Sequence, residues 1–336
     1  MNHDTFQGPL FIVGMPRSGT KLLRDLLNRH PRISICTVES EFIPYLVRTY
    51  GADAALSPAQ LLGVHARLRQ SAFYFDLAER DVAPSAEAFV QACAGKGWPE
   101  VFAFVLKRCG PKPYRPGMIW GDKTPGYLNH IALLKALFPA AKFIHIIRDP
   151  RDYGLSAERT WGKNLFRAAH RWRYSIQRAR EIGAGIAADY LEVRYEDLLG
   201  APVAVMEPLT SFLGLRFDPA ILTLDQPAEN YGAAKGTTRI LEANANKFET
   251  DLRQDAIRRI EEITYPVLRS LNYTVLYARR EAPLTPAALA LYQLQDGWKS
   301  IWFHVRDKGL ITGVRYFVML YRQSSWRLGW RSAGER

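Results

Sequence analysis

The stretch Leu10-Phe11-Ile12-Val13-Gly14-Met15-Pro16-Arg17-Ser18-Gly19-Thr20-Lys21-Leu22-Leu23 decides the fold of this chain. An apolar run is followed by small residues and then by an apolar segment of helical period, which predicts a buried strand, a tight turn and a helix start. Gly14 and Gly19 let the backbone approach a ligand closely, and a helix N-terminus favours an anion. Four side chains add donors: Arg17, Ser18, Thr20 and Lys21. The stretch therefore predicts an anion-binding site.

The same loop departs from the pattern of nucleotide triphosphatases. That pattern, Gly-x-x-x-x-Gly-Lys-Ser/Thr, needs a lysine where Thr20 stands and a hydroxyl where Lys21 stands. The Mg²⁺-binding hydroxyl is out of place, which disfavours a kinase-like phosphotransferase. For this motif alone, a tight strand-to-helix turn with incidental cations is the alternative.

Composition sets further bounds. The 336 residues, 48% hydrophobic and 12% aromatic, are enough for a full core. The formal net charge of +12 favours an anionic partner such as nucleic acid, lipid or a doubly phosphorylated nucleotide. Three widely spaced cysteines predict reduced, buried thiols rather than disulfides or a zinc site. Because we find neither a signal-like N-terminus nor an apolar run of membrane-spanning length, we expect a cytoplasmic protein.

Periodicity along the chain predicts an α/β fold around a parallel sheet. The first helix should end at His30-Pro31, and further strands are expected at residues 33–36, 118–120, 142–147 and 190–194. Helices are expected at residues 131–138, 151–186, 202–213 and 251–271. The charged loops after Val13, Trp120 and Ile147 should meet at one sheet edge, because the carboxyl ends of parallel strands lie together. His145, inside an apolar strand, is expected to be a core histidine.

Three other regions carry less chemical information. Residues 41–110 indicate helices that begin at Ser57-Pro58, after Ser85 and at Pro99, and that form a cap or a wall for the acceptor. Residues 225–247 are polar without a period and form a candidate lid. Residues 286–336 interleave aromatic and basic side chains, which predicts packing on the core, contact with a second subunit or contact with anionic lipid.

A second motif makes a family resemblance specific. Arg148 and Ser156 lie on either side of a strand-to-helix turn, and an arginine fork suits phosphate. This run resembles the 3′-phosphate motif of sulfotransferases that use 3′-phosphoadenosine 5′-phosphosulfate (PAPS), and Pro16-Arg17-Ser18-Gly19-Thr20 resembles their 5′-phosphosulfate loop. The resemblance is closest to the tyrosylprotein and glycan branch. For the Arg148 run alone, a surface salt-bridge cluster is the alternative.

The resemblance implies a three-layer α/β sandwich with a central parallel sheet, the P-loop-like sulfotransferase fold. We expect a sulfotransferase domain at 1–280 with a helical insertion at 41–110, and a basic, aromatic helical extension at 281–336. PAPS would be the donor and 3′,5′-bisphosphoadenosine (PAP) the product, without a metal. The implied cofactor-binding residues are Gly14, Arg17, Ser18, Gly19, Thr20, Lys21, Arg148, Ser156, Tyr195 and Lys247.

The resemblance also implies the catalytic residues. Glu39 matches the general base by position, and Lys123, with Arg17, matches contacts to the sulfonate. Helix capping is the alternative for Glu39, a solvated turn is the alternative for Lys123, and Glu41 is the next candidate base. Lys21 departs from the family, because a threonine is usual there. Its ammonium either joins the phosphosulfate site or points away along the helix.

The expected activity is sulfonate transfer from PAPS to a hydroxyl of a glycan or a lipid-linked saccharide. Transfer to a peptide tyrosine is the alternative acceptor reaction, and a non-catalytic module for anionic glycans or nucleic acid is the alternative class. For the enzyme we expect no nucleic-acid partner. A peripheral contact of residues 286–336 with the inner membrane face and a homodimer are the expected associations.

Overall fold

The computed structural model describes residues 6–52, 55–227 and 236–308. These residues divide into two compact units. Unit 1 contains the chain up to residue 149 and residues 174–247, and unit 2 contains residues 150–173 and the chain from 248 onward. The boundary expected at residue 280, between the sulfotransferase domain and its extension, does not coincide with either unit and stays a prediction. Residues 309–336 of the expected extension and 228–235 of the candidate lid lie outside the described residues.

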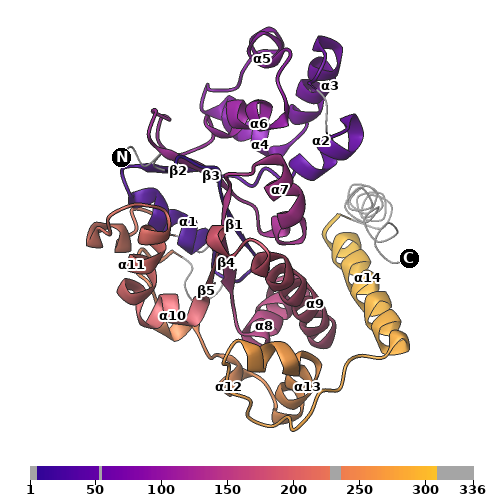
Figure 1. Ribbon diagram of the computed structural model, residues 1–336. Coiled ribbons are helices and arrows are strands. Elements are labelled where there is room, and N and C mark those ends of the chain that lie inside the picture. The colour runs from indigo at the N-terminus through magenta and orange to yellow at the C-terminus, as the bar shows by residue number, and fades with distance from the viewer. Residues whose placement is uncertain (1–5, 53–54, 228–235, 309–336) are drawn as a thin grey trace. The chain divides into compact units, whose positions relative to one another are not determined.

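A five-stranded parallel sheet forms the centre of the described part of unit 1 (Figure 1). Its strands, in spatial order, are β2 (Ile33–Ile35), β3 (Ile119–Lys123), β1 (Leu10–Gly14), β4 (Lys142–Ile147) and β5 (Tyr190–Arg194). All four strand pairs are parallel, so the carboxyl ends of β3, β1 and β4 lie side by side. The predicted parallel sheet and its shared charged edge are confirmed.

Helices cover both faces of this sheet. On one face, Leu10 and Ile12 pack with leucines of α1 (Thr20–Arg29), α10 (Tyr195–Gly200) and α11 (Pro202–Phe212). On the other face, Phe11 stacks on Phe143 and meets the ring of Tyr127 edge-on. Tyr127 belongs to the 3₁₀ helix η1 (Pro125–His130), which leads into α7 (Ile131–Leu137). The sandwich of three layers is therefore confirmed.

The stretch expected as a helical insertion lies in unit 1 and is helical. It consists of α2 (Ile43–Tyr50), α3 (Pro58–Leu68), α4 (Ala72–Glu79), α5 (Ala86–Cys93) and α6 (Trp98–Leu106). Ser57 and Gln60 form a reciprocal capping box at the start of α3, and the Ser85 hydroxyl accepts the Ala88 N–H at the start of α5. Pro99 lies in the first turn of α6. The predicted helix starts are confirmed, because side-chain oxygens satisfy N–H groups that a helix leaves unpaired.

The helical stretch expected over residues 151–186 consists of two helices. The chain forms α8 (Pro150–Trp161) and α9 (Leu165–Ala184), and Gly162 between them has a left-handed backbone with φ +63°. The Asn164 carboxamide accepts the N–H groups of Phe166 and Arg167, each at 3.0 Å, and so caps α9. A glycine and an asparagine within an otherwise helical pattern interrupt it here.

In unit 2, α8 and the first part of α9 pack with α12 (Phe248–Asp251), α13 (Gln254–Ser270) and α14 (Pro286–Lys308). A buried ion pair joins Arg151 of α8 to Glu261 of α13 at 2.7 Å. Short 3₁₀ helices also occur in unit 1: η2 (Ala187–Asp189), η3 (Pro219–Leu222) and η4 (Glu242–Asn244). No helix in the described ranges is both long and apolar enough to span a bilayer.

Two expectations about buried polar groups hold. The three cysteines are buried and carry no disulfide. His145 is fully buried in β4, its Nδ1 lies 2.5 Å from the Tyr190 hydroxyl, and burial lowers its pKa to about 3. It is therefore a neutral core histidine.

Candidate active site

The turn between β1 and α1 forms a concave row of backbone N–H groups. Ser18 N donates to the carbonyl of Met15 at 3.2 Å, which closes the turn. Arg17 and Gly19 both lie in the left-handed region, with φ +71° and +85°. At Gly19 the helix begins without a side-chain cap, so the N–H groups of its first turn face the loop. This backbone favours an anion.

Close contacts explain both glycines of the loop. A Cβ at Gly14 would lie 2.5 Å from the carbonyl oxygen of Ile146 on β4, and one at Gly19 would lie 2.3 Å from the ring of Tyr195. The Ser18 hydroxyl is fully buried and has no hydrogen-bond partner among the described residues. Such a hydroxyl costs about 1–3 kcal/mol unless a ligand satisfies it. The loop is therefore built to receive a polar ligand.

Arg148, the first residue after β4, reaches back to this loop. Its Nη1 donates to the carbonyl of Arg17 and its Nη2 to that of Asn244, each at 3.0 Å. The guanidinium also lies 4.8 Å from the centre of the Tyr195 ring, and the residue is 6% exposed. Arg148 thus joins the anion loop to a second group of residues at the same sheet edge.

Asn244 is the centre of that second group. Its Nδ2 donates to the Tyr195 hydroxyl at 2.7 Å, and its Oδ1 accepts from Lys247 Nζ at 2.5 Å. The structure therefore brings together three predicted cofactor-binding residues, Arg148, Tyr195 and Lys247. Sequence reasoning missed Asn244, because it lies in a polar segment without a period. Ser156 lies half-buried on α8 of unit 2, and its role stays a prediction.

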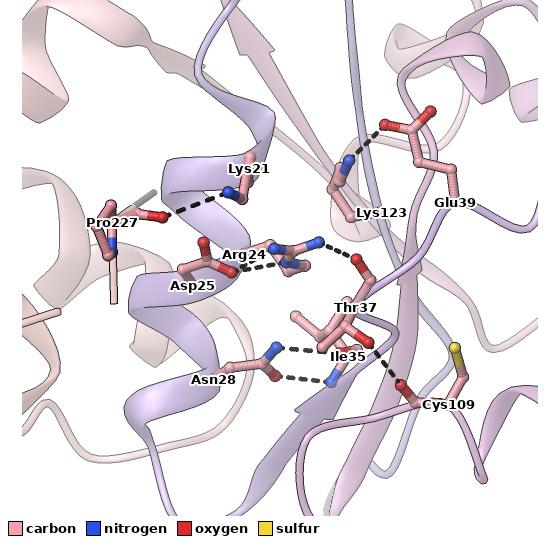
Figure 2. A network of polar contacts seen from close by, with 10 residues as sticks. All are labelled: Lys21, Arg24, Asp25, Asn28, Ile35, Thr37, Glu39, Cys109, Lys123 and Pro227. Carbon is pink, nitrogen blue, oxygen red and sulfur yellow. Dashed lines mark hydrogen bonds and ion pairs between the residues drawn. The ribbon is translucent and has the colours of Figure 1, made fainter. Parts of the chain in front are cut away.

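Glu39 and Lys123 form an ion pair, with 2.5 Å between Oε1 and Nζ (Figure 2). The Lys123 side chain is 7% exposed and that of Glu39 is 40% exposed. Lys123 is the last residue of β3, so the expectation that it belongs to a loop after Trp120 is wrong. Residues 121–123 extend the strand because β3 lies between β2 and β1. There they pair with Leu10, Phe11 and Ile12 of β1.

Contacts with α1 fix the segment that carries Glu39. The Asn28 carboxamide exchanges two hydrogen bonds with the backbone of Ile35, at 3.0 and 2.7 Å, and Arg24 donates to the Thr37 carbonyl (Figure 2). Beyond Glu39, the Ser40 N–H donates to the Thr124 hydroxyl at 3.0 Å. The backbone on both sides of Glu39, the candidate base, is thus held in place by hydrogen bonds.

The two residues that sequence reasoning left ambiguous now have positions. Glu41 is exposed and has a left-handed backbone with φ +52°. Lys21 donates from Nζ to the carbonyl of Pro227 at 3.3 Å, and Figure 2 shows it pointing toward Pro227. Its predicted part in cofactor binding stays a prediction.

The arrangement can hold two anionic groups at one sheet edge. One would lie on the loop beside Arg17, Ser18 and Thr20, and the other near Arg148. In the described part of the chain, no three His, Cys, Asp or Glu side chains gather as a metal site would require.

Comparison with protein families gives one match over most of the site. The family model described as "Sulfotransferase family" matches residues 9–219. Protein-tyrosine sulfotransferase A of Caenorhabditis elegans is 26% identical over 229 residues, which are 65% of this chain and 52% of that protein. The nodulation protein NoeE of Sinorhizobium fredii is 32% identical over 164 residues, 48% of this chain and 34% of that protein. The chain spans about half the length of the first curated relatives it matches.

Two solved structures share the fold. The sulfotransferase domain from the curacin biosynthetic pathway matches with a TM-score of 0.53 and 21% identity, over 80% of this chain and 99% of that one. The sulfotransferase domain of the Synechococcus olefin synthase gives 0.53 and 24%, over 78% and 96%. At this identity the likeness concerns the fold alone.

Proposed function

The chain belongs to the sulfotransferase family, and from that premise we propose that it transfers the sulfonate group of PAPS to an acceptor hydroxyl. The observation that carries this proposal is the Glu39–Lys123 pair at the sheet edge that also holds the anion loop. A hydroxyl that attacks a sulfonate needs a base for its proton and a cation for the developing charge. A non-catalytic module for anions would need the cation without the carboxylate, so the pair favours an enzyme.

In this proposal the two anion-binding groups divide the donor between them. The loop N–H groups, Arg17, Ser18 and Thr20 bind the 5′-phosphosulfate. Arg148 binds the 3′-phosphate, with Tyr195 and Lys247 beside it. Family resemblance adds Ser156 and Lys21 to the donor site.

The proposed reaction is an in-line displacement at sulfur. The acceptor oxygen bonds to sulfur while the bond from sulfur to the 5′-phosphate oxygen breaks, and PAP leaves with that electron pair. Glu39 accepts the hydroxyl proton. Lys123, Arg17 and the loop N–H groups stabilise the charge that grows on the sulfonate and the leaving phosphate. By analogy with phosphoryl transfer, positioning and electrostatics supply most of the rate enhancement.

We propose a hydroxyl of a glycan or a lipid-linked saccharide as the acceptor, with α2 to α6 as the acceptor-side wall. Peptide tyrosine is the second candidate, because relatives from several animals are protein-tyrosine sulfotransferases. These relatives are 24–26% identical to this chain and are matched over about half of their length, which leaves room for another acceptor.

A transfer assay tests both levels of the proposal. The purified chain is incubated with PAPS carrying labelled sulfate and a panel of glycans, lipid-linked saccharides and tyrosine peptides, with Mg²⁺ or with a chelator. We expect label on the saccharides and equal rates in both buffers. Label on tyrosine alone would replace the acceptor, and Mg²⁺-dependent phosphoryl transfer would replace the reaction class. Binding of PAP without any transfer would favour the binding module.

We also propose a peripheral contact of α14 with anionic lipid at the inner membrane face. Within unit 2, Leu289 and Tyr292 pack on the cluster of Ala169 and Ile260, and Asp296 pairs with Arg167. Another stripe of the helix is apolar and exposed: Leu291, Leu294 and Trp298 are 53%, 73% and 70% exposed. From Lys299 onward the sequence has eight Lys and Arg against two Asp and Glu, which complements an anionic surface.

Vesicle flotation tests this contact. We expect the full chain to float with anionic vesicles and less with neutral ones, and the double variant Leu294→Ser, Trp298→Ser to lose flotation. A control variant, Leu62→Ser, removes a leucine of α3 that is 51% exposed. Equal flotation of all variants would end the membrane proposal. A shift of the double variant from dimer to monomer in sedimentation would assign the stripe to a homodimer instead.

A further inference from the structure

Asp122 is a buried carboxylate next to the proposed catalytic pair. It precedes Lys123 on β3, and consecutive strand residues point to opposite faces of a sheet. In the parallel register Asp122 lies opposite Phe11, whose ring packs against Tyr127. Asp122 therefore lies on the Tyr127 face of the sheet, behind the strand end that presents Lys123.

The environment of this carboxylate is unusual for a structural residue. Asp122 is fully buried, and neither of its oxygens has a hydrogen bond of standard geometry with the described residues. Burial raises the pKa of Asp122 to about 6, while the hydroxyls of Thr124 and Ser40 and the charge of Lys123 act to lower it. A buried carboxylate that lacks full hydrogen bonding costs stability, so its presence calls for a use.

The hydroxyls beside Asp122 are linked by hydrogen bonds. The Ile43 N–H donates to the Tyr127 hydroxyl at 3.3 Å, and that hydroxyl lies 2.6 Å from Ser40 Oγ. The Ser40 N–H donates to Thr124 Oγ1. Each hydroxyl is thus joined to a backbone donor, directly or through Tyr127. Either hydroxyl can donate in the Ser40–Tyr127 hydrogen bond. When Tyr127 donates, the hydroxyl protons of Ser40 and Thr124 are available to Asp122, the anion beside both.

These hydrogen bonds hold together the two segments that carry the proposed catalytic pair. Ser40 directly follows Glu39, and Thr124 directly follows Lys123. We propose that Asp122 is a positioning residue, which accepts the hydroxyl protons of Ser40 and Thr124 and so holds Glu39 against Lys123. The proposal rests on the transfer reaction proposed above, in which Glu39 is the base.

Protonation of Asp122 should weaken its hydrogen bonds with the hydroxyls of Ser40 and Thr124. We call these two residues, joined through Asp122, the strap. A neutral carboxyl carries a proton of its own and has less capacity to accept two others. The titratable groups that interact electrostatically with Asp122 are Lys123 on β3, Glu39, Tyr127, Cys36 and Cys109. Burial raises the pKa values of Tyr127 and Cys36, whereas the hydrogen bond with Cys36 lowers the pKa of Cys109. The pKa of Asp122 is raised to about 6, so its charge changes near neutral pH.

Steady-state kinetics of Asp122→Asn in the full chain test the proposal. We expect kcat to fall by about 10- to 100-fold, because the reacting groups are misplaced, while KM for PAPS changes by less than about threefold. In the wild type, kcat should fall below about pH 6 as Asp122 is protonated. In the variant, kcat should no longer fall below about pH 6; we call this fall the acid limb. If Asp122 had only a structural role, the acid limb would remain.

A second pair of variants distinguishes loss of the Ser40–Thr124 contact from the general effect of removing a buried hydroxyl. Thr124→Val removes the hydroxyl that receives the Ser40 N–H, and we expect it to lower kcat in the same way. Thr210→Val is the matched control: this hydroxyl is equally buried but bonds only to carbonyls of α11, its own helix, among the described residues. Should Asp122→Asn fail to fold, the threonine pair still decides.

The outcomes distinguish this inference from the proposed reaction. A wild type that transfers no sulfonate to any acceptor would overturn the reaction, and the inference with it. An active wild type whose Asp122→Asn variant keeps full kcat and the acid limb would overturn the inference alone. Equal effects of Thr124→Val and Thr210→Val on kcat would also overturn it.

Discussion

The carboxylate of Glu39 and the ammonium of Lys123 meet at 2.5 Å although 84 positions separate them in the sequence. Glu39 follows β2 and Lys123 ends β3, so the pairing of two neighbouring strands brings them together. Lys123 is nearly buried and Glu39 is open to solvent. The pair therefore presents a fixed cation from inside the protein and a reachable carboxylate from outside it.

Glu39→Gln should lose turnover and keep donor affinity. The amide cannot accept the acceptor proton, and loss of a general base costs about 10²- to 10⁴-fold in kcat. Labelled-sulfate transfer gives kcat, and calorimetry gives PAP affinity. Glu41→Gln is the matched control, since Glu41 is two residues away and exposed. Near-normal transfer by Glu39→Gln, with loss in Glu41→Gln, would move the base to Glu41.

Arg148→Ala should weaken PAP binding. The arginine would contact the 3′-phosphate and also supports the loop through the Arg17 carbonyl. A charged hydrogen bond contributes about 1.5–3 kcal/mol, so we expect a rise in Kd of about 10- to 150-fold by calorimetry. Arg180→Ala removes the same charge from an ion pair with Glu192 and should leave Kd unchanged. Unchanged affinity in Arg148→Ala would refute the 3′-phosphate assignment.

Gly19→Ala should disrupt the donor site more than backbone strain alone predicts. A Cβ there would clash with the Tyr195 ring, on which the Arg148 guanidinium lies. We expect PAP affinity to fall by about tenfold or more, which corresponds to about 1.4 kcal/mol. Gly162→Ala is the matched control, because Gly162 also has a positive φ but has no atom within 4 Å of a built Cβ. Similar affinity losses in both variants would contradict the steric argument.

The fold was largely predictable because its strands are apolar runs separated by clear helix signals. β1 and β4 are buried throughout or nearly so, which is the pattern that a central parallel strand requires. The end of β3 was not predictable, since Asp122 and Lys123 are charged and only their neighbours in the sheet keep them in a strand. The break at Gly162 was missed because the helical pattern resumes three residues later.

The site was predictable where a motif carries it. The glycine loop, Arg148 and Lys123 lie at strand ends, so the order of motifs along the chain indicated one shared edge. Asn244 gave no signal, because its importance comes from contacts with Tyr195 and Arg148, which are 49 and 96 positions away. Asp122 gave no signal either, since its burial depends on Tyr127 and Ser40 and no local pattern shows it.

Asp122→Asn should also change how stability depends on pH. In the unfolded chain this carboxyl has an ordinary pKa of 3.8, and burial raises it to about 6 in the folded protein. Between these values the folded state binds more protons than the unfolded state, so Asp122 makes the protein less stable as pH rises from about 4 to about 6. The difference in pKa corresponds to about 3 kcal/mol, to within a factor of two.

His145 acts with the opposite sign, which decides the design of the measurement. Burial lowers its pKa to about 3, so its contribution is present above the ordinary value of 6.5 and is lost as pH falls. The free energy of unfolding is measured in urea for wild type and Asp122→Asn at about pH 5 and pH 8. The difference between the two proteins at each pH cancels the His145 contribution, because both proteins contain this histidine. We expect the free energy of unfolding of the variant, relative to wild type, to be higher at pH 8 than at pH 5. A variant that is stabilised at high pH yet slower in transfer would show that the buried charge costs stability and serves catalysis. A constant difference across pH would mean that folding does not raise the pKa of Asp122.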